Sequence, residues 1–309
     1  MENVSRLAVV IVNYNSWKYT IDCLNSIDSS VSNYSHFKIF LVENGSSDDS
    51  ARHLSACISS LKDLQVELII SDTNTGFAGG NNLGIKKAFE LGFGYYFLLN
   101  NDTIISDDVF SSIIEFFNNN SDCSIIALHT KSITGEREIY CSRRRPSFFD
   151  FVLLYHSPFW DWKRLGSYKR HYMMEADFNK SFNVYAGSGA AIAMKKIYFD
   201  LTGFLDENTF LYSEEFIIAE RAVEAGIVTK FMPQPQIIHL GGQSTKNVKA
   251  FSYIEYCKSE KYLLGVIYKY NNLSLTIIML YRMLKYIFKC FLYKDYRLNA
   301  LNFIKIYFP

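Results

Sequence analysis

Short apolar runs alternate with helical patterns along the first part of the chain. The runs cover residues 7–12, 37–42, 66–70 and 95–99, and each is followed by polar residues and then by apolar positions spaced three or four apart. Apolar runs of this length are typical of buried strands, and the spacing between them is typical of amphipathic helices. Four such alternations within about 120 residues predict an α/β fold with a parallel sheet of right-handed βαβ units.

Each strand run ends in residues that can bind a ligand. The polar ends are Asn13-Tyr14-Asn15, Glu43-Asn44-Gly45-Ser46, Asp72 with the residues after it, and Asn100-Asn101-Asp102. The carboxyl ends of parallel strands meet at one edge of the sheet, where α/β folds bind their ligands. A carboxylate there, such as Asp102, is a ligand for a hard divalent cation that also holds a diphosphate. The alternative is that Asp102 or Thr103 caps the next helix.

A glycine-rich segment follows the third strand run. Gly76, Gly79 and Gly80 precede a helix expected to start near Asn82, and glycines there let the backbone approach a ligand closely. The sequence has no G-x-G-x-x-G after its first strand and no G-x-x-x-x-G-K-[ST]. It therefore does not fit a nicotinamide dehydrogenase or a P-loop enzyme.

Composition and cysteine content indicate how large a core the chain can bury and which cellular compartment it suits. The chain has 309 residues, 49% of them hydrophobic and 20% charged, so it can bury a large core in one main domain with an appendage. Its six cysteines form no C-x-x-C motif, and its N-terminus lacks the apolar core of a signal peptide. Both observations favour a reducing cytoplasm.

The middle of the chain, from about residue 130 to 182, loses the strand and helix pattern and reads as an insertion. It contains Arg143-Arg144-Arg145-Pro146 and the aromatic residues Phe148, Phe149, Tyr155, Phe159, Trp160, Trp162 and Tyr168. Aromatic and basic side chains together bind single-stranded nucleic acid, but they also bind sugars and lipid headgroups. Because no RNA or DNA motif is present, we expect no nucleic-acid partner.

Further candidates follow the insertion. Glu214 and Glu215 open a helical segment that extends to Ala225, and His239 ends an apolar segment that starts at Val228. Acidic residues at a helix N-terminus are also explained by the helix dipole, and a lone histidine is more often structural than a ligand.

The last fifty residues carry the basic charge of the chain. Residues 261–309 hold eight Lys or Arg and only Asp295, about +7, which leaves about −6 on the rest. Apolar Ile277, Leu280, Leu284, Ile287 and Phe291 fall on one helical face, and Arg282, Lys285 and Lys289 fall on another. The longest uncharged run, of twelve residues, is too short to span a bilayer. We expect a helix lying on an anionic membrane surface; the alternative is a helix packed on the main domain with its basic side in solvent.

In this order the motifs resemble family 2 glycosyltransferases, particularly their bacterial rhamnosyltransferase-like branch. The resemblance spans about residues 7–245. Its carriers are V-I-V-N-Y-N at 10–15, V-E-N-G-S-S-D at 42–48, N-T-G-F-A-G-G-N-N-L-G at 74–84, L-N-N-D-T at 99–103, G-F-L-D-E at 203–207, Y-S-E-E at 212–215 and the segment around His239.

The resemblance implies a GT-A type nucleotide-diphospho-sugar transferase fold, with a mostly parallel central sheet flanked by helices. The catalytic domain would cover residues 1–245 and a helical, basic, amphipathic tail residues 246–309. The resemblance assigns nucleotide-sugar binding to Asn13, Tyr14, Asn15, Glu43, Asn44, Ser46, Asp72, Asn82, Asn100 and Asn101, and metal binding to Asp102 and His239.

The implied chemistry needs a cation and a base. Mg²⁺ or Mn²⁺ would stabilise the leaving nucleoside diphosphate as a Lewis acid. A carboxylate, Glu215 or its neighbour Glu214, would take the proton of the acceptor hydroxyl, and attack from the face opposite the leaving group would invert the anomeric centre. The chain departs from the family at Asn100, where the metal motif usually starts with Asp, at the Glu-Glu pair, which is usually Glu-Asp, and at Ile217, often an acid.

The sequence thus predicts an inverting, metal-dependent glycosyltransferase at the cytoplasmic face of a bacterial membrane. Its expected donor is dTDP-rhamnose, and its expected acceptor is a lipid-linked precursor of a surface polysaccharide such as O-antigen or capsule. Membrane contact would run through residues 273–309, and the oligomeric state is left open. Two alternatives remain: a glycan- or nucleotide-binding protein without activity, for which Asn100 and Ile217 argue, and a sugar nucleotidyltransferase, whose basic glycine-rich signature the first strand end lacks.

Overall fold

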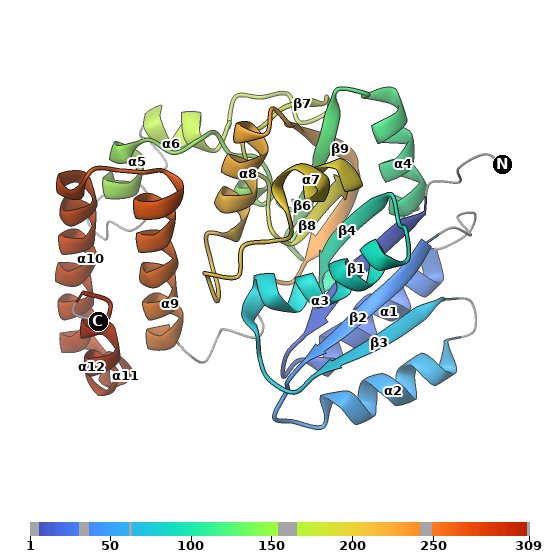
Figure 1. The fold of residues 1–309 in the computed structure, drawn as a ribbon, viewed down its shortest axis with the longest axis horizontal. Coiled ribbons are helices and arrows are strands. Elements are labelled where there is room, and N and C mark those ends of the chain that lie inside the picture. The colour runs from blue at the N-terminus through green and yellow to red at the C-terminus, as the bar shows by residue number, and fades with distance from the viewer. Residues whose placement is uncertain (1–5, 31–36, 62–63, 154–165, 242–248, 308–309) are drawn as a thin grey trace.

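A nine-stranded sheet forms the centre of the protein (Figure 1). The computed structural model describes residues 6–30, 37–61, 64–153, 166–241 and 249–307. The strand order is β3-β2-β1-β4-β8-β6-β9-β5, and β7 pairs with β9 beside this path. The strands are β1 Leu7–Asn13, β2 Phe37–Asn44, β3 Val66–Ser71, β4 Tyr95–Asn100, β5 Thr103–Ile104, β6 Cys123–Lys131, β7 Phe182–Asn183, β8 Ala191–Lys195 and β9 Val228–His239.

The first half of the chain folds as its alternating pattern predicts. β3, β2, β1 and β4 run parallel, with Val10 opposite both Phe40 and Leu98. The connecting helices are α1 Trp17–Ser30, α2 Ser50–Ser60 and α3 Gly76–Glu90, and α4 Val109–Asn119 follows β5. The predicted α/β sheet is confirmed, and its parallel strand ends meet at one edge.

The second half mixes strand directions. β8 runs antiparallel to both β4 and β6, whereas β9 runs parallel to β6 and antiparallel to β5 and β7. The sheet is therefore parallel over its first four strands and mixed beyond them. An apolar run buried on both faces reveals that a strand exists but carries no sign of its direction.

Helices cover both faces of the sheet, which explains why the strand runs are apolar throughout. In β1, Leu7, Val9 and Ile11 face a core that includes α1, α2 and α4. Ala8 and Val10 face the other core, which includes α3, α7 (Lys196–Thr202) and α8 (Glu214–Glu224). Side chains alternate between the two faces of a strand, so both sets of positions must be apolar.

α3 starts six residues before the expected start near Asn82. It begins at Gly76, and its glycines mainly serve packing: a side chain at Gly80 would collide with the side chains of Val12 and Asn44. Gly80 lets α3 lie close to β1 and β2, whereas a side chain at Gly79 would meet Thr75. The expectation that these glycines admit a ligand stays a prediction.

The inserted segment between β6 and β8 contains only short helices and one short strand among its described residues. It contains η1 Ile139–Cys141, α5 Phe148–Leu153, α6 Gly166–His171 and β7. Tyr155, Phe159, Trp160 and Trp162 lie outside the described residues, and Tyr168 is buried.

The C-terminal part is helical: α9 Lys249–Tyr262, η3 Leu263–Ile267, α10 Asn272–Leu292, α11 Lys294–Leu298 and α12 Ala300–Ile304. The predicted domain boundary between residues 245 and 246 lies outside the described residues and stays a prediction. Within the described part of the chain, every helix is too short or too polar to cross a bilayer.

α10 turns its basic side toward the protein, which contradicts the alternative expectation of a packed helix with its basic side in solvent. Arg282 is fully buried and binds Glu260 of α9 through two hydrogen bonds, of 2.6 Å from Nε and 2.7 Å from Nη2. Its Nη2 also donates to the carbonyl oxygen of Phe151 at 2.8 Å. Lys289 lies over the ring of Tyr253, 5.3 Å from the centroid. These contacts join α10 to α9 and α5.

Replacing Arg282 alone is expected to destabilise the protein strongly. Arg282→Ala leaves Glu260 buried without its cation, and breaking a buried pair in this way costs about 3–5 kcal/mol of unfolding free energy. Urea denaturation followed by circular dichroism measures the loss. The double variant Arg282→Met/Glu260→Leu removes both charges and is expected to regain most of it; a single variant within about 1 kcal/mol of wild type would contradict the prediction.

Candidate active site

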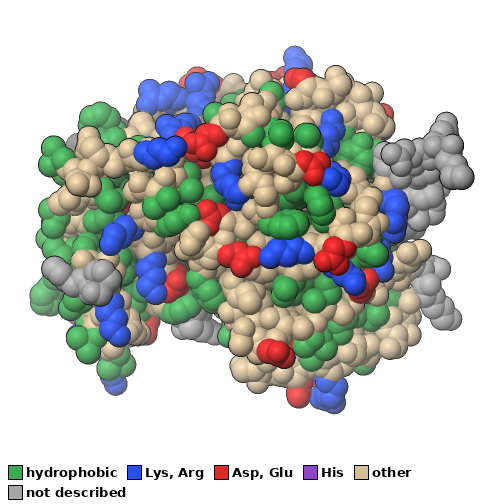
Figure 2. All heavy atoms as spheres, viewed as in Figure 1, with side chains coloured by type: hydrophobic (Ala, Val, Ile, Leu, Met, Phe, Trp, Pro, Cys, Tyr) green, Lys and Arg blue, Asp and Glu red, His purple; other side chains and the backbone are tan. Residues whose placement is uncertain are grey.

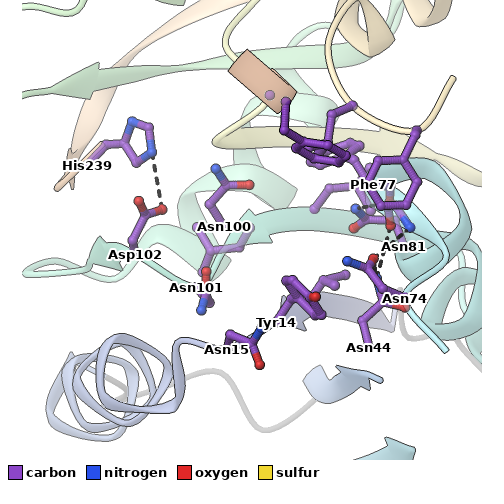
Figure 3. Close-up of a pocket in the computed structure, with 18 residues that line it drawn as sticks. Tyr14, Asn15, Asn44, Asn74, Phe77, Asn81, Asn100, Asn101, Asp102 and His239 are labelled. Carbon is purple, nitrogen blue, oxygen red and sulfur yellow. Dashed lines mark hydrogen bonds and ion pairs between the residues drawn. The ribbon is translucent and has the colours of Figure 1, made fainter. Parts of the chain in front are cut away.

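A cleft of about 670 Å³ lies at the carboxyl ends of β1, β2 and β4 (Figure 3). Strand ends and the α3 N-terminus supply one side, and residues from the loop before α8 and from α9 supply the other. Its lining residues include Tyr14, Asn15, Asn44, Asn74, Phe77, Asn81, Asn100, Asn101, Asp102, Gly189, Phe210, Leu211, His239 and Phe251. The parallel strand topology places the cleft where the polar strand ends predict a site.

The lining is rich in amides and poor in cations. Among the described residues that line it, Asp102 and His239 are the only acidic or basic side chains, and none is Lys or Arg. A strongly anionic ligand such as a diphosphate therefore finds little positive charge in the described wall. Such a ligand needs a bound cation to offset its charge.

Asp102 and His239 meet because the two-residue strand β5 pairs with the end of the long strand β9. β5 pairs with β9 so that Thr103 lies opposite His239, and the Leu240 amide donates to the Asp102 carbonyl at 2.9 Å. The His239 Nε2 lies 3.2 Å from the Asp102 Oδ1, as the dashed line in Figure 3 marks. The two predicted metal ligands thus come together at the end of the cleft.

A third group, Glu138, holds the other side of the imidazole. The His239 Nδ1 lies 2.8 Å from the Glu138 Oε1. Burial alone would lower the pKa of His239, but its ion pair with Asp102 and its hydrogen bond and ion pair with Glu138 outweigh burial and raise the pKa to about 10. The protonated imidazole of His239 is therefore strongly paired with these two carboxylates.

The arrangement fits a divalent cation that takes part of its coordination from a ligand. His239 Nε2 is buried and has no hydrogen-bond partner, although it lies at ion-pair distance from Asp102. No cluster of three or more metal-binding side chains occurs in the described residues. The protein would supply Asp102 and His239, and a diphosphate and water would supply the remaining oxygen ligands.

Some of the residues predicted to bind the nucleotide line the cleft. They are Tyr14, Asn15, Asn44, Asn100 and Asn101. Asn101 is also tied down by its own hydrogen bonds, since its Nδ2 donates to Ser16 Oγ and Thr20 Oγ1, each at 2.8 Å. Its side chain therefore anchors the strand end to α1.

The other predicted nucleotide-binding residues, Asn13, Glu43, Ser46, Asp72 and Asn82, are not among the lining residues. Asn13 donates to Ser46 Oγ at 3.3 Å, and Glu43 accepts from the Ser46 amide at 2.9 Å, so these three shape the loop after β2.

Asn82 and Asp72 point elsewhere. The Asn82 Nδ2 donates to the Leu205 carbonyl at 2.9 Å and to Glu207 Oε1 at 2.7 Å, which ties α3 to the loop after α7. Asp72 is exposed on the loop after β3. A direct contact of either side chain with a ligand in the cleft is not supported by this geometry.

Asn44 organises the glycine-rich loop beside the cleft. Its Nδ2 donates to Asn74 Oδ1 and to the Gly76 carbonyl, both at 3.1 Å, and its Oδ1 accepts from Thr75 Oγ1 at 2.8 Å. Gly76 has φ +74°, and a side chain there would collide with the Phe210 carbonyl. The positive φ and the close approach both require glycine.

The predicted catalytic glutamates start α8 after a strained turn. Tyr212 and Ser213 have φ of 71° and 66°, a region that costs non-glycine residues energy and is common near functional sites. Glu215 Oε1 accepts from the Gly189 amide at 3.1 Å and lies 3.6 Å from the Arg143 Nη2. Because Gly189 lines the cleft, Glu215 lies directly behind the cleft wall.

Glu214 points away from the cleft into a small cavity lined by Leu205, Ile217 and Arg221. Its Oε2 is buried without a hydrogen-bond partner. Burial, with a smaller contribution from the charge of Glu215, raises the pKa of Glu214 to about 8. At neutral pH this carboxyl is therefore largely protonated.

Sequence reasoning missed several residues of the site. Asn74, Phe77 and Asn81 lie in the motif at 74–84, and Arg143 begins the arginine run, so their motifs were visible but their roles were not. Phe210, Phe251 and Glu138 carry no motif of their own. Only the fold brings these three to the cleft and to His239.

Comparison with known proteins places these features in a family. The family model described as Glycosyl transferase family 2 matches residues 8–199. A teichoic acid poly(glycerol phosphate) polymerase of Staphylococcus epidermidis is 24% identical over 147 residues, 48% of this chain and 19% of that protein. An uncharacterized glycosyltransferase of Haemophilus influenzae is 27% identical over 118 residues, 37% of this chain and 43% of that protein. The chain spans less than half the length of either relative.

Solved structures share the fold at low identity. S. aureus TarS 1–349 matches with a TM-score of 0.54 and 12% identity, covering 90% of this chain and 70% of that one. The mannosyltransferase PcManGT from Pyrobaculum calidifontis, solved with GDP-Man and Mn²⁺, matches with a TM-score of 0.59 and 11% identity, covering 89% and 68%. These likenesses confirm the expected GT-A type fold.

The pKa of Glu214 predicts how stability depends on pH. Its pKa in the folded protein, about 8, lies above the ordinary value of 4.5, so the native state binds more protons between these values and stability falls as pH rises from about 4.5 to 8. Glu214→Gln removes this dependence. We expect its melting temperature to exceed that of wild type increasingly from pH 5 to pH 8.5; parallel melting profiles of the two proteins would contradict the assignment.

Proposed function

The chain belongs to glycosyl transferase family 2, and from this membership and the cleft geometry we propose that it transfers a sugar from a nucleotide-diphosphate donor to an acceptor hydroxyl with inversion. One observation carries the proposal. The cleft ends at the Asp102–His239 pair, lacks a described Lys or Arg, and has Glu215 behind its wall at Gly189. A cation site and a carboxylate beside one cleft are the two parts that this chemistry needs.

The cation we propose is Mg²⁺ or Mn²⁺, held by Asp102 and His239. When bound, it supplies positive charge to the leaving diphosphate. The Mn²⁺ and GDP-Man in the PcManGT structure support a metal and a nucleotide sugar in this fold. Asn100, which stands where the family motif usually has Asp, leaves Asp102 as the carboxylate ligand.

Glu215 is the base we propose, and Glu214 is the less suitable of the pair. Glu215 faces the Gly189 amide and the Arg143 guanidinium, which together hold its carboxylate next to the cleft. Glu214 points into a small cavity, and burial raises its pKa to about 8, which favours its protonated form at neutral pH. A protonated carboxyl cannot accept the proton of the acceptor hydroxyl.

The donor's nucleoside would lie among the amides and aromatic rings. We assign contacts to Tyr14, Asn15, Asn74 and Asn81, with Phe77 and Phe251 as apolar walls. Of the remaining predicted nucleotide-binding residues, Asn13, Glu43, Ser46 and Asn82 would act by shaping the loops. UDP-GlcNAc bound to S. aureus TarS shows that this fold accepts a nucleotide sugar.

The finer identity of the reaction rests on the sequence motifs. We propose membership of the rhamnosyltransferase-like branch, with dTDP-rhamnose as donor and a lipid-linked precursor of O-antigen or capsule as acceptor. The reaction would take place at the cytoplasmic face of a bacterial membrane, with residues 273–309 making the peripheral contact. Of the two alternatives, a binding protein without activity is the stronger, because Ile217 stands where the family often has an acid. The nucleotidyltransferase is the weaker, because the described lining of the cleft has no Lys or Arg.

Loss of the base is expected to abolish turnover and spare binding. Glu215→Gln should lower kcat by about 10²- to 10⁴-fold, since its amide cannot take the acceptor proton, whereas Glu214→Gln should stay within a few-fold of wild type. Transfer and donor hydrolysis are measured with Mn²⁺ over a panel of nucleotide sugars that includes dTDP-rhamnose, and donor binding by thermal shift.

Three outcomes of that experiment would count against the proposal. Equal activity of Glu215→Gln and wild type would remove the base. Donor stabilisation without turnover by the wild-type protein would favour the inactive binding protein. Turnover of another sugar alone would replace dTDP-rhamnose and leave the mechanism intact.

A further inference from the structure

The side of α10 that faces away from the protein is mostly apolar, with Asn272 and Thr276 as its exposed polar residues near the start of the helix, and we call its apolar residues the α10 apolar face. It consists of Leu273, Ile277, Leu280, Leu284, Ile287, Phe288, Phe291 and Leu292, which are between 42% and 79% exposed. Figure 1 shows α10 as an outermost helix, and Figure 2 shows hydrophobic side chains gathered along the same edge. A patch of this kind marks an interaction site, because single exposed apolar residues are ordinary but a continuous row is not.

The helix is inverted relative to a normal surface helix. A helix at the edge of a protein usually buries its apolar side and exposes its polar side. In α10 the buried side includes the charged Arg282 beside Ile278, Met279 and Tyr286, and Lys285 and Lys289 lie over the ring of Tyr253. The cations are thus used for internal contacts, and the apolar face is left for a partner.

The surrounding charge identifies that partner. Lys294, Arg297 and Lys305 are exposed just beyond the helix, and residues 261–309 carry about +7 with Asp295 as their one acid. A second copy of the chain would bring two such positive segments together, which like-charge repulsion opposes. An anionic lipid surface attracts the same cations and accepts the apolar side chains.

We propose that α10 lies flat in the interface of an anionic membrane with its apolar face inserted. Tyr281 and Tyr293 flank the face at positions that suit the headgroup level. The proposal deepens the membrane location given under the proposed function: insertion by Leu284 and its neighbours supplies the main contact, and Lys294, Arg297 and Lys305 supply the attraction.

Vesicle sedimentation of full-length variants tests this face. Wild-type protein is expected to sediment with phosphatidylcholine vesicles containing about a quarter phosphatidylglycerol. Leu284→Glu/Phe291→Glu should lower the bound-to-free ratio at least tenfold, because two charges cannot enter the hydrocarbon cheaply. Leu201→Glu, at an exposed position of α7, is the matched control and should bind like wild type. Point variants are preferred to a deletion of α10, because deleting α10 would remove Arg282 and leave Glu260 without its cation.

Several results would overturn this assignment. Wild-type protein that stays in the supernatant, or a double variant that binds as well as wild type, excludes insertion. A wild-type dimer in light scattering that the double variant converts to a monomer shows that a second copy covers the face instead. Sugar transfer to a soluble acceptor, measured on the same variants, reports the proposed function separately and should not change.

A second, independent observation concerns Glu138, the partner of His239 on the hairpin that follows β6. Its side chain is mostly buried, its Oε1 lies 2.8 Å from His239 Nδ1, and its own amide donates to the Thr130 carbonyl at 3.0 Å. The carboxylate is thus fixed from its backbone and accepts the Nδ1 proton. With that proton held on Nδ1, Nε2 is the nitrogen left to face Asp102 and the cleft.

We infer that Glu138 is a positioning residue that orients His239 toward a divalent cation. Carboxylates that accept the second N–H of a histidine ligand fix its tautomer and ring orientation. The inference rests on the metal assignment of the proposed function. It adds a residue from the inserted segment, for which the sequence predicted no role in the site.

Mn²⁺ binding by the purified protein tests Glu138 without measuring turnover. Glu138→Ala should weaken the Mn²⁺ dissociation constant by about 10- to 100-fold in calorimetry and reduce the ¹⁴N modulation of bound histidine in pulsed electron paramagnetic resonance. Glu138→Gln keeps an acceptor and should recover part of both signals. Glu136→Ala, an exposed acid on the same hairpin, is the control.

The outcomes separate Glu138 from the metal itself. Wild-type affinity and wild-type nitrogen modulation in Glu138→Ala would overturn the positioning role and leave Asp102 and His239 as ligands. Failure of the wild-type protein to bind Mn²⁺ would overturn both the metal assignment and the role of Glu138. An unchanged melting temperature in Glu138→Ala excludes unfolding as the cause of a lost signal.

Discussion

The pairing of Thr103 with His239 is the contact on which the candidate site depends. It joins β5, which follows β4 directly, to the end of β9, and the Leu240 amide donates to the Asp102 carbonyl at the same junction. Without this short antiparallel ladder, Asp102 would be an isolated carboxylate and His239 an ordinary buried histidine. The ladder brings Asp102 and His239, which are far apart in sequence, together as an ion pair at the end of the cleft.

The C-terminal helices complete the site as well as extending the chain. Phe251 of α9 lines the cleft. Further along α9, Ser259 donates to the Leu211 carbonyl at 2.6 Å and Tyr262 donates to Asp206 at 2.8 Å, so the helix holds the loop that leads into Glu214 and Glu215. The strained backbone at Tyr212 and Ser213 is maintained by such contacts, because left-handed non-glycine residues persist only where neighbouring structure fixes them.

The sequence predicts that the polar strand ends gather at one edge of the sheet, because apolar runs mark the strands and parallel strands end at the same edge. The direction in which each side chain points could not be predicted. Asn81 and Asn82 are adjacent in sequence but about 100° apart around α3, so Asn81 lines the cleft whereas Asn82 donates to the Leu205 carbonyl. The direction of β8 and the contact of Glu138 with His239 depend on long-range pairing, which no local pattern encodes. The glycines were assigned to ligand approach, whereas Gly80 serves packing between α3 and Asn44.

α10 shows why an amphipathic pattern does not by itself say which side faces inward. Hydrophobic burial favours the apolar side, but the buried acid Glu260 on α9 requires a cation, and an unpaired buried charge costs more than an exposed leucine gains by burial. Arg282 meets that requirement and turns the basic side inward. The orientation of the apolar face toward the outside then follows, because both sides of one helix cannot face the protein. A structural ion pair therefore determines which surface is available to a membrane.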